Sequence, residues 1–380
     1  MKKKAEITTV LYITAFVLWL AVALIRYTYF KDMLPTEIIS RVFFCLAQAL
    51  LFYKLVLELQ FSFRQIAGVF LLLLFMTIAW AGGRLQFSTM FLLIYCAKNV
   101  PFDKILKTAF LAQLVVFSMT IVASQTGFLE DVIWESGSRN RHGLGFTHCM
   151  LASHFGLYLS LIYIAIVGRM KWWRAVMILA GNWLLYKVTD GRTDMILAIA
   201  FVVLAYLIGN VSEKLKWEKV WGAFLAITPF LMYGISIVSA YMYNGDNPEM
   251  LKMNLFLNNR LRLASDAISA YGFSLFGEKI TWVGASVTYY KPEAVYNYVD
   301  NSYLMMSFTY GVIFVVAYCA ALGYVLYKKT IQKDTMTVVC LLVIMAFGMI
   351  NPQSMYLTYN PFLLLLAMAW NPTTKRDVVI

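Results

Sequence analysis

The sequence predicts an all-α protein, a polytopic bundle of about 12 transmembrane helices. Of the 380 residues, 61% are hydrophobic and only 14% are charged, which is more apolar surface than a soluble chain of this length buries in one core. Apolar runs of roughly 17 to 24 residues recur along almost the whole chain, and each can cross a hydrocarbon layer about 30 Å thick. The runs lack the period-2 alternation of a membrane barrel, so helices are the expected spanning form.

Polar residues, glycines and prolines divide the apolar runs into spans. We place the spans at 8–25, 38–55, 66–82, 84–97, 105–125, 147–167, 172–187, 193–209, 219–241, 302–326, 335–350 and 355–370. The run 84–97 is short enough to be re-entrant. The basic N-terminus followed by 8–25 resembles a signal peptide, but we expect this segment to remain as the first span. The whole chain, 1–380, is expected to form a single integral membrane domain.

The lysines set the expected orientation. They concentrate in the short segments that a cytoplasmic start would place inside the cell, as the positive-inside rule requires. We therefore expect a multi-pass protein of the cell membrane with both termini cytoplasmic. The same rule accounts for the net charge of +12, which in a soluble chain would raise the question of nucleic acid. No nucleic-acid partner is expected.

Two connections on the expected outer side are long, 126–146 and 242–301. The second joins the ninth and tenth spans and is too long for a turn. Its part 254–272 has apolar residues at helical spacing from Leu257 to Ile268, which predicts an amphipathic helix lying on the spans. The stretch that follows, WVGASVTYYKPEAVYNYV, suits stacking on sugar rings or anchoring at the membrane interface. These two outer loops are expected to carry the functional site.

Arginines, unlike lysines, gather on the expected outer side. They include Arg139, Arg141, Arg192, Arg260 and Arg262. A guanidinium group offers a rigid fork of donors that binds phosphate oxygens bidentately, whereas the lysine ammonium is a hydrated point charge. The excess of arginine therefore indicates a phosphate-bearing ligand on the outer leaflet.

The alternative reading of each arginine is an ion pair or a snorkelling side chain at a helix end. In the hairpin KVTDGRTDM (187–195), Arg192 can pair with either of two aspartates. In the long loop, Arg262 and Asp266 are four residues apart and are expected to pair on a helix surface. Arg260 has no such local partner, so it is the freer of the two to bind a ligand.

All three histidines, His142, His148 and His154, lie close together at the outer end of the sixth span. An offset of six residues places the last two on different faces of a helix, so no metal site is expected. His154 is expected to make an interhelical hydrogen bond. His148, at the mouth of the span, is the better candidate for contacting a ligand. The cysteines fall in or beside apolar runs, as packing residues do, and the chain contains no nucleotide or metalloprotease motif, so no cofactor is expected.

Four stretches resemble, in order, the motifs of Wzy-type polysaccharide polymerases in the O-antigen ligase-like superfamily. RHGLGFTH resembles R-x-x-L-G-F-x-H-P-N, and VTDGRTDMILAI resembles a T-x-S-R-T segment that opens a span. LNNRLRLASDAISAYGFSLFG is similar to an N-G-R-L…L-F-G loop helix, and VDNSYLMMSFTYGV to a D-N-S-Y-L…G-V helix start. The resemblance runs from about residue 138 to 326. Cys149-Met150 departs from the family's Pro-Asn, and Gly191 from its usual serine.

The resemblance implies a polymerase of lipid-linked oligosaccharide repeat units for capsule or exopolysaccharide. A growing glycan would move from undecaprenyl diphosphate to the non-reducing end of a new lipid-linked unit on the outer leaflet. The implied partners are undecaprenyl-diphosphate-linked oligosaccharides and membrane lipid, with a chain-length regulator and a flippase as further candidates. The resemblance implies roles for Arg141, His148, Arg192, Arg260 and Asp300.

Such a transfer needs positive charge where the diphosphate leaves and a base where the acceptor hydroxyl loses its proton. The candidate arginines for the diphosphate are Arg139, Arg141, Arg192 and Arg260. The candidate bases, between which the sequence does not decide, are His148, Asp300 and Glu278. The aromatic outer loop is expected to hold the acceptor sugars.

Two other functions stay open. One is an O-antigen-ligase-like transferase, which passes the glycan to a different acceptor. The other is a transporter of lipid-linked oligosaccharides, which is less favoured because transporters place ionisable residues near the membrane midplane and often repeat one half. In this chain the charges gather on the expected outer side and the halves are dissimilar.

Overall fold

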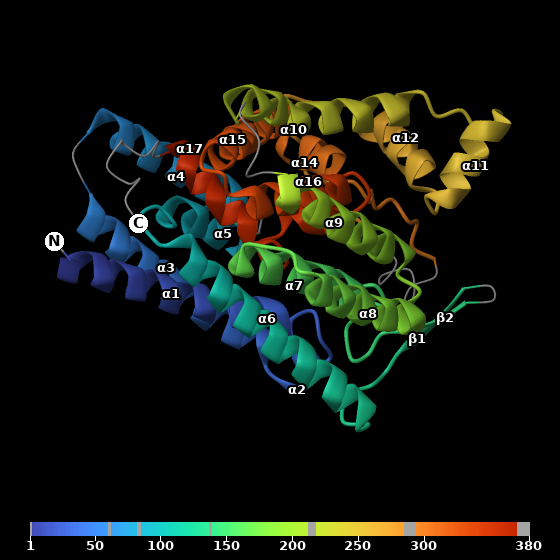
Figure 1. The fold of residues 1–380 in the computed structure, drawn as a ribbon, viewed down its shortest axis with the longest axis horizontal. Coiled ribbons are helices and arrows are strands. Elements are labelled where there is room, and N and C mark those ends of the chain that lie inside the picture. Colours follow the sequence, from blue (N-terminus) through green and yellow to red (C-terminus); the bar gives the residue numbers. More distant parts are fainter. Residues whose placement is uncertain are drawn as a thin grey trace. The chain divides into compact units, whose positions relative to one another are not determined.

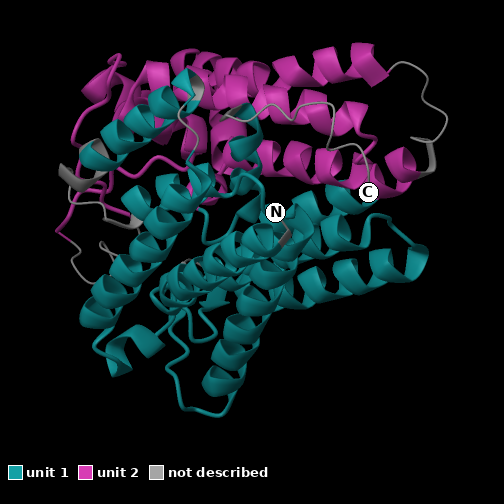
Figure 2. Ribbon diagram, turned by 90° about the vertical axis from the view of Figure 1, so that its left-hand side faces the viewer, with its two compact units in different colours: residues 1–202, 357–380 teal, residues 203–356 magenta. Residues whose placement is uncertain are grey.

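The computed structural model describes residues 2–59, 62–81, 85–136, 139–211, 218–284 and 293–370. The regular secondary structure of these residues is almost entirely helical (Figure 1). The chain divides into two compact units, residues 1–202 with 357–380 and residues 203–356 (Figure 2). The first unit is discontinuous, since its last residues follow the whole of the second. The expectation of one integral membrane domain stays a prediction.

Six of the described helices are long and apolar enough to cross a membrane. They are Lys3–Ile25, Thr36–Glu58, Phe102–Gln125, Arg192–Gly209, Glu218–Tyr241 and Val312–Ile331. Shorter apolar helices cover Gln65–Thr77, Phe87–Cys96, Leu151–Val167 and Thr335–Gly348. These helices support the predicted class, a helical membrane protein. The number of spans and the sidedness of the loops stay predictions.

The first unit is built from helices and one hairpin. Its elements are α1 (Lys2–Ile25), α2 (Phe30–Met33), α3 (Thr36–Glu58), α4 (Phe63–Ala81), α5 (Leu85–Cys96), α6 (Phe102–Gln125), β1 (Ile133–Ser136), β2 (Arg139–His142), α7 (Leu151–Val167), α8 (Trp172–Thr189), the start of α9 (Arg192–Val211), the 3-10 helix η3 (Pro361–Leu366) and α17 (Ala367–Trp370). Helix α1 packs against α3 and α6, and α7 contacts both α6 and α8. The fully buried Tyr359 packs its ring against Tyr27 at 5.1 Å and Phe155 at 4.5 Å between ring centroids. The returning segment therefore completes the interior of this unit.

The segment predicted as the last span, 355–370, is not a single helix. It contains the end of the 3-10 helix η2 (Pro352–Met355), a buried turn at 357–359, the 3-10 helix η3 and one turn of α-helix. Gln113 of α6 donates from Nε2 to the carbonyls of Thr358 and Tyr359, at 2.9 and 3.1 Å. Pro361, which cannot donate a backbone hydrogen bond, begins the 3-10 helix. Because a buried side-chain amide binds these carbonyls, the backbone can be buried here without being helical.

The loop 126–146 contains a hairpin that the sequence did not predict. Strands β1 and β2 are antiparallel, with Trp134 opposite Arg141 and Ser136 opposite Arg139. Side chains two residues apart on a strand point to the same face, so the two arginines share one. Strand β2 packs against α8, as Figure 1 shows. The helical class stands, with this one small sheet added within the part of the chain that the structure describes.

The regular elements described in the second unit are all helices, and the described residues of the long segment between Tyr271 and Ser302 are not helical. Its elements are the end of α9, α10 (Glu218–Tyr241), α11 (Pro248–Phe256), α12 (Arg260–Tyr271), α14 (Ser302–Tyr310), α15 (Val312–Ile331), α16 (Thr335–Gly348) and the 3-10 helix η2 (Pro352–Met355). Helix α10 packs along α15. The predicted span 302–326 is split between α14 and α15 at Gly311, whose φ is +91°. A Cβ at Gly311 would collide with the carbonyl of Leu275, so the close approach of that segment requires glycine.

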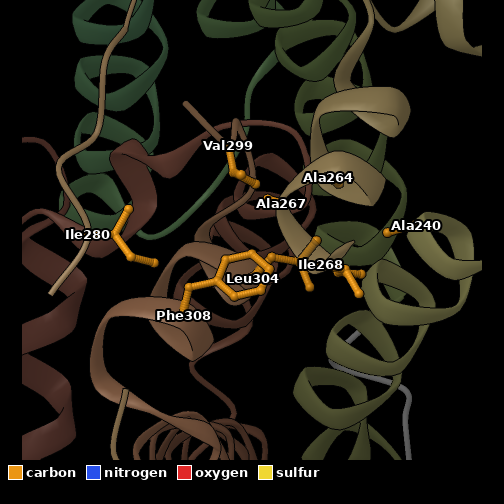
Figure 3. Close-up of a cluster of buried hydrophobic side chains, with 8 residues drawn as sticks. All are labelled: Ala240, Ala264, Ala267, Ile268, Ile280, Val299, Leu304 and Phe308. Atoms are coloured by element: carbon orange, nitrogen blue, oxygen red, sulfur yellow. The ribbon is translucent and has the colours of Figure 1, made fainter. Parts of the chain in front are cut away.

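The amphipathic helix predicted within 254–272 is confirmed as α12, although it begins only at Arg260. Before it, Asn258 and Asn259 have positive φ and separate it from α11. Figure 3 shows its apolar side chains directed toward α14. The buried cluster consists of Ala240, Ala264, Ala267, Ile268, Ile280, Val299, Leu304 and Phe308. The middle of the aromatic stretch that follows, 285–292, lies outside the described residues.

Candidate functional site

Three of the four candidate arginines for the diphosphate meet around one carboxylate in the first unit. Asp190 Oδ2 lies 3.2 Å from Arg139 Nε and 3.8 Å from Arg141 Nη2. Asp190 Oδ1 lies 3.1 Å from Arg192 Nε. Three guanidinium groups against one carboxylate leave a formal charge of +2. We call these four residues the Asp190 cluster.

The local backbone explains why these residues meet. The hairpin places Arg139 and Arg141 on one face, and β2 packs against α8. Asp190 ends α8 in a left-handed conformation, with φ of 50° and ψ of 35°. Arg192 follows as the first residue of α9. The chain therefore turns between two helices at the point where the hairpin arrives.

The cluster keeps capacity to bind an anion. The Arg192 side chain is 54% exposed, whereas those of Arg139 and Arg141 are 29% and 21% exposed. Arg141 Nε and Asp190 Oδ2 are buried and have no hydrogen-bond partner among the described residues. Asp190 Oδ2 therefore interacts with Arg139 and Arg141 by charge alone and accepts no hydrogen bond from either guanidinium group. Arg192 is the most accessible of the three guanidinium groups.

His148 lies in the turn before α7, beside the Asp190 cluster. Its ring is 5.0 Å from the ring of Trp134 between centroids, and its Nδ1 accepts a hydrogen bond from the N–H of Met150 at 3.2 Å. Burial, followed by electrostatic interaction with His154 and Arg141, lowers the pKa of His148 to about 4. The ring is therefore neutral at pH 7. With Nδ1 accepting, a neutral ring carries its proton on Nε2, which makes Nε2 a donor.

The lowered pKa of His148 predicts how stability depends on pH. The unfolded chain binds this proton near pH 6.5 and the folded chain only near pH 4. The free energy of unfolding is therefore unaffected by this group above pH 6.5 and decreases as the pH drops toward 4. His148→Gln removes the titrating group, and we expect the variant to lose less thermal stability over this range than the parent protein. Melting temperatures at pH 7 and pH 4.5 measure the difference. An equal loss in both proteins would contradict the assignment.

His154 makes the interhelical hydrogen bond predicted for it. Its Nδ1 lies 2.8 Å from Oδ1 of Asp194, which joins α7 to α9. Both side chains are almost completely buried, at 4% and 3% exposure. The second oxygen, Asp194 Oδ2, is also buried and has no hydrogen-bond partner among the described residues. This pair leaves Asp190 as the carboxylate that binds Arg192.

The packing of α7 against the end of α8 explains why position 191 is a glycine. A Cβ there would lie 2.5 Å from Ser153 Oγ and 2.8 Å from Ser153 Cβ, because the Ser153 hydroxyl bonds that of Thr189 across the α7–α8 contact. Cys149, in the turn before α7, is buried, and its sulfur accepts a hydrogen bond from the Arg141 guanidinium. Burial raises the pKa of the Cys149 thiol, so it stays protonated at neutral pH.

A serine at position 191 should therefore destabilise the protein. We expect Gly191→Ser to cost about 1–3 kcal/mol, the usual range for an added group in a packed interior. Ser153→Ala in the same chain removes the hydroxyl that Cβ meets first and should recover part of the loss. Melting temperatures of the single and double variants in detergent provide the comparison. A single variant as stable as the parent would show that the contact is not tight.

His142 has a structural contact. Its Nδ1 lies 2.6 Å from Asp131 Oδ2, and Asp131 Oδ1 accepts the N–H of Leu144 at 2.7 Å. Leu144 has a φ of +52°, so this carboxylate holds a turn that the backbone does not favour. The histidine therefore fixes the end of the hairpin loop.

The fourth candidate arginine, Arg260, lies in the second unit. Its Nε is 3.5 Å from Asp300 Oδ2, with side-chain exposures of 15% and 27%. Arg260 has no local acid, as expected, but Asp300 from a distant segment pairs with it. The expected pair of Arg262 with Asp266 is absent from the salt bridges of the described residues; instead the N–H of Arg262 donates to Asn254 Oδ1.

The remaining candidate bases also lie in the second unit. Asp300 is paired with Arg260, and both act on Tyr296, whose pKa is raised chiefly by burial and also by the Asp300 charge. Glu278 is exposed, and its backbone N–H donates to the carbonyl of Phe308 at 2.8 Å. Glu278 is thus reachable by solvent, whereas Asp300 is half-buried beside a cation.

The sequence indicated Asp190 only as a possible partner of Arg192, and it did not single out Trp134. Asp190 is the centre of the arginine cluster, and Trp134 lies against the ring of His148. The alternation of Ile133 to Ser136 and the arginines two residues apart were the signals of the hairpin that brings them in. Among the described residues, no group of three or more His, Cys, Asp or Glu side chains could hold a metal ion.

Comparison of the chain with models of known families, with curated proteins and with solved structures finds no match.

Proposed function

We propose that the protein is a membrane glycosyltransferase that polymerises lipid-linked oligosaccharide repeat units, as Wzy-type polysaccharide polymerases do. The donor is a growing glycan on undecaprenyl diphosphate, and the acceptor is the non-reducing end of a new lipid-linked unit. The proposal includes about 12 spans, both termini in the cytoplasm and the loops 126–146 and 242–301 on the outer side.

The observation that carries the proposal is the Asp190 cluster. Guanidinium groups bind phosphate oxygens through two parallel hydrogen bonds, and three of them share a single carboxylate here. The surplus of +2 suits the two negative charges of a diphosphate diester. Donors fixed by a hairpin and a helix start need little reorganisation when charge develops on the leaving group.

In the proposed reaction the bond between the anomeric carbon of the donor glycan and the diphosphate oxygen breaks. A new bond forms from that carbon to the acceptor hydroxyl oxygen, and the hydroxyl proton passes to a base. Polyprenyl diphosphate leaves with the electron pair of the broken bond, and the arginines stabilise its charge. No nucleotide or metal is needed as a reactant.

His148 suits a role as a donor better than a role as the base. Its Nδ1 is occupied by the N–H of Met150, and the neutral ring presents the Nε2 proton. A group whose pKa is about 4 is also a weak acceptor at neutral pH. We infer that His148 donates to a phosphate or sugar oxygen. The carboxylates Asp300 and Glu278 then stand as the candidate bases.

The test is an assay of the purified full-length protein with its own lipid-linked repeat unit in nanodiscs. A ladder of product lengths supports polymerisation. Transfer of one glycan to an unrelated acceptor would favour the ligase-like alternative, and movement of the intact lipid across the bilayer without a new glycosidic bond would favour transport. Adding a chain-length regulator or flippase from the same source tests the proposed partners by a change in ladder length or rate.

A further inference from the structure

An apolar groove runs along α8 in the first unit. It has a volume of about 520 Å³ and lies between α6, α7 and α8. Leu114 of α6, Gly156 and Tyr163 of α7, and Gly181 and Leu185 of α8 are among its lining residues. The groove is not covered by another part of the chain along α8, because the apolar side chains beside it on that helix are exposed.

The surface that lines the groove is almost entirely apolar. Asn182 is 95% buried, and its amide donates to Ser160 Oγ at 3.0 Å and to the carbonyl of Ile178 at 2.9 Å. Those donors are thus used inside the helix pair. Gly181 leaves space, because a Cβ there would meet no atom within 4 Å. The groove therefore suits a hydrocarbon chain.

The groove leads toward the Asp190 cluster. Ile178, Asn182 and Leu185 repeat along one face of α8, and the same face continues to Thr189, the last residue of the helix. From Leu185 to Thr189 the helix rises about 6 Å at 1.5 Å per residue. Asp190 follows at once, with strand β2 packed against α8. The apolar groove and the Asp190 cluster thus follow one another along the same face of α8.

We propose that this groove holds the isoprene units nearest the head group of a polyprenyl diphosphate whose two phosphates lie on the Asp190 cluster. The identity of the head group rests on the proposed function. The charge distinguishes this ligand from bulk phospholipid. A diphosphate diester brings two negative charges to a cluster of +2, whereas a phosphodiester head brings one. The helix α8 would then recognise the lipid carrier independently of the sugars attached to it.

Gly181→Leu tests the groove, because it fills the open space while replacing a helix-interior glycine with a better helix former. A matched control exists in the second unit. Gly234 of α10 borders another apolar groove, of about 570 Å³, and a Cβ there also meets no atom within 4 Å. Gly234→Leu therefore makes the same chemical change in the same kind of place.

The experiment uses the purified full-length protein in phosphatidylcholine nanodiscs and a benzophenone-bearing farnesyl diphosphate as the photoreactive probe. We expect cross-links on α7 and α8, competed by unlabelled undecaprenyl diphosphate. Gly181→Leu should lower their yield at least tenfold, and Gly234→Leu should leave it unchanged. An unchanged yield in Gly181→Leu, an equal loss in both variants, or equal competition by phosphatidylglycerol would each overturn the proposal.

This experiment needs no sugar and no turnover, so it separates the groove from the reaction. A protein that polymerises, yet in which Gly181→Leu cross-links like the parent, would refute the groove alone. A protein that cross-links as expected, yet forms no glycosidic bond with any lipid-linked unit, would refute the proposed polymerase and leave the groove standing.

Discussion

Arg192→Ala should lower the rate of glycan polymerisation by about 10²–10³-fold, the usual effect of removing one fixed donor from a developing negative charge. Arg192 is the most exposed guanidinium of the Asp190 cluster. Its removal leaves Asp190 paired with Arg139 and Arg141, so the fold should persist. The measurement is the initial rate of ladder formation by the purified variant at saturating lipid-linked substrate.

Two further variants sharpen this result. Arg192→Lys keeps the charge but loses the two-pronged hydrogen bond, so it should recover only part of the rate. Arg169 lies in the connection between α7 and α8, at the other end of α8 from Asp190, and is exposed. Arg169→Ala removes one positive charge there and should polymerise like the parent. If Arg192→Ala and Arg169→Ala have equal rates and equal melting temperatures, Arg192 does not bind the diphosphate.

His154→Leu should be the most destabilising of the substitutions considered. It leaves the buried Asp194 carboxylate without its histidine, and the second oxygen of that carboxylate already lacks a hydrogen-bond partner among the described residues. Removing one member of a buried pair of this kind costs on the order of 3–5 kcal/mol. The melting temperature in detergent, followed by tryptophan fluorescence, should fall sharply.

The second substitution Asp194→Ala in the same chain separates the stranded carboxylate from the loss of packing. With both polar groups gone, no buried charge is left unpaired, and the double variant should melt well above His154→Leu. A double variant less stable than the single one would mean that the pair contributes chiefly through packing.

The helical class follows from the sequence because each span must satisfy its own backbone hydrogen bonds in lipid, so length and apolarity suffice. The segment 355–370 shows where that reasoning stops. Its carbonyls at Thr358 and Tyr359 are bound by Gln113, which lies 245 and 246 residues away in the chain. An apolar run that receives hydrogen bonds from a distant side chain looks the same, in sequence, as one that supplies its own.

For the candidate site, the sequence predicts the arginines better than the residues that pair with them. The charge pattern predicts all three arginines, Arg139, Arg141 and Arg192, and the family resemblance implies roles for the last two. Their common partner Asp190 depends on the register of a hairpin, which single residues do not specify. The partner of Arg260 was missed because local spacing rules reach only one helical turn, and Asp300 belongs to another segment.

The discontinuity of the first unit sets an order for its assembly. Tyr359 lies among Tyr27 and Phe155, yet it emerges from the ribosome after all of residues 203–356. The unit whose synthesis starts first must therefore wait for the second to be made before its interior can close. Until Tyr359 is made, its place in the interior is empty, and the apolar side chains that it would cover near the start of α7 stay exposed. A chain stopped after residue 356 should persist as a half-built unit that proteases and membrane chaperones recognise.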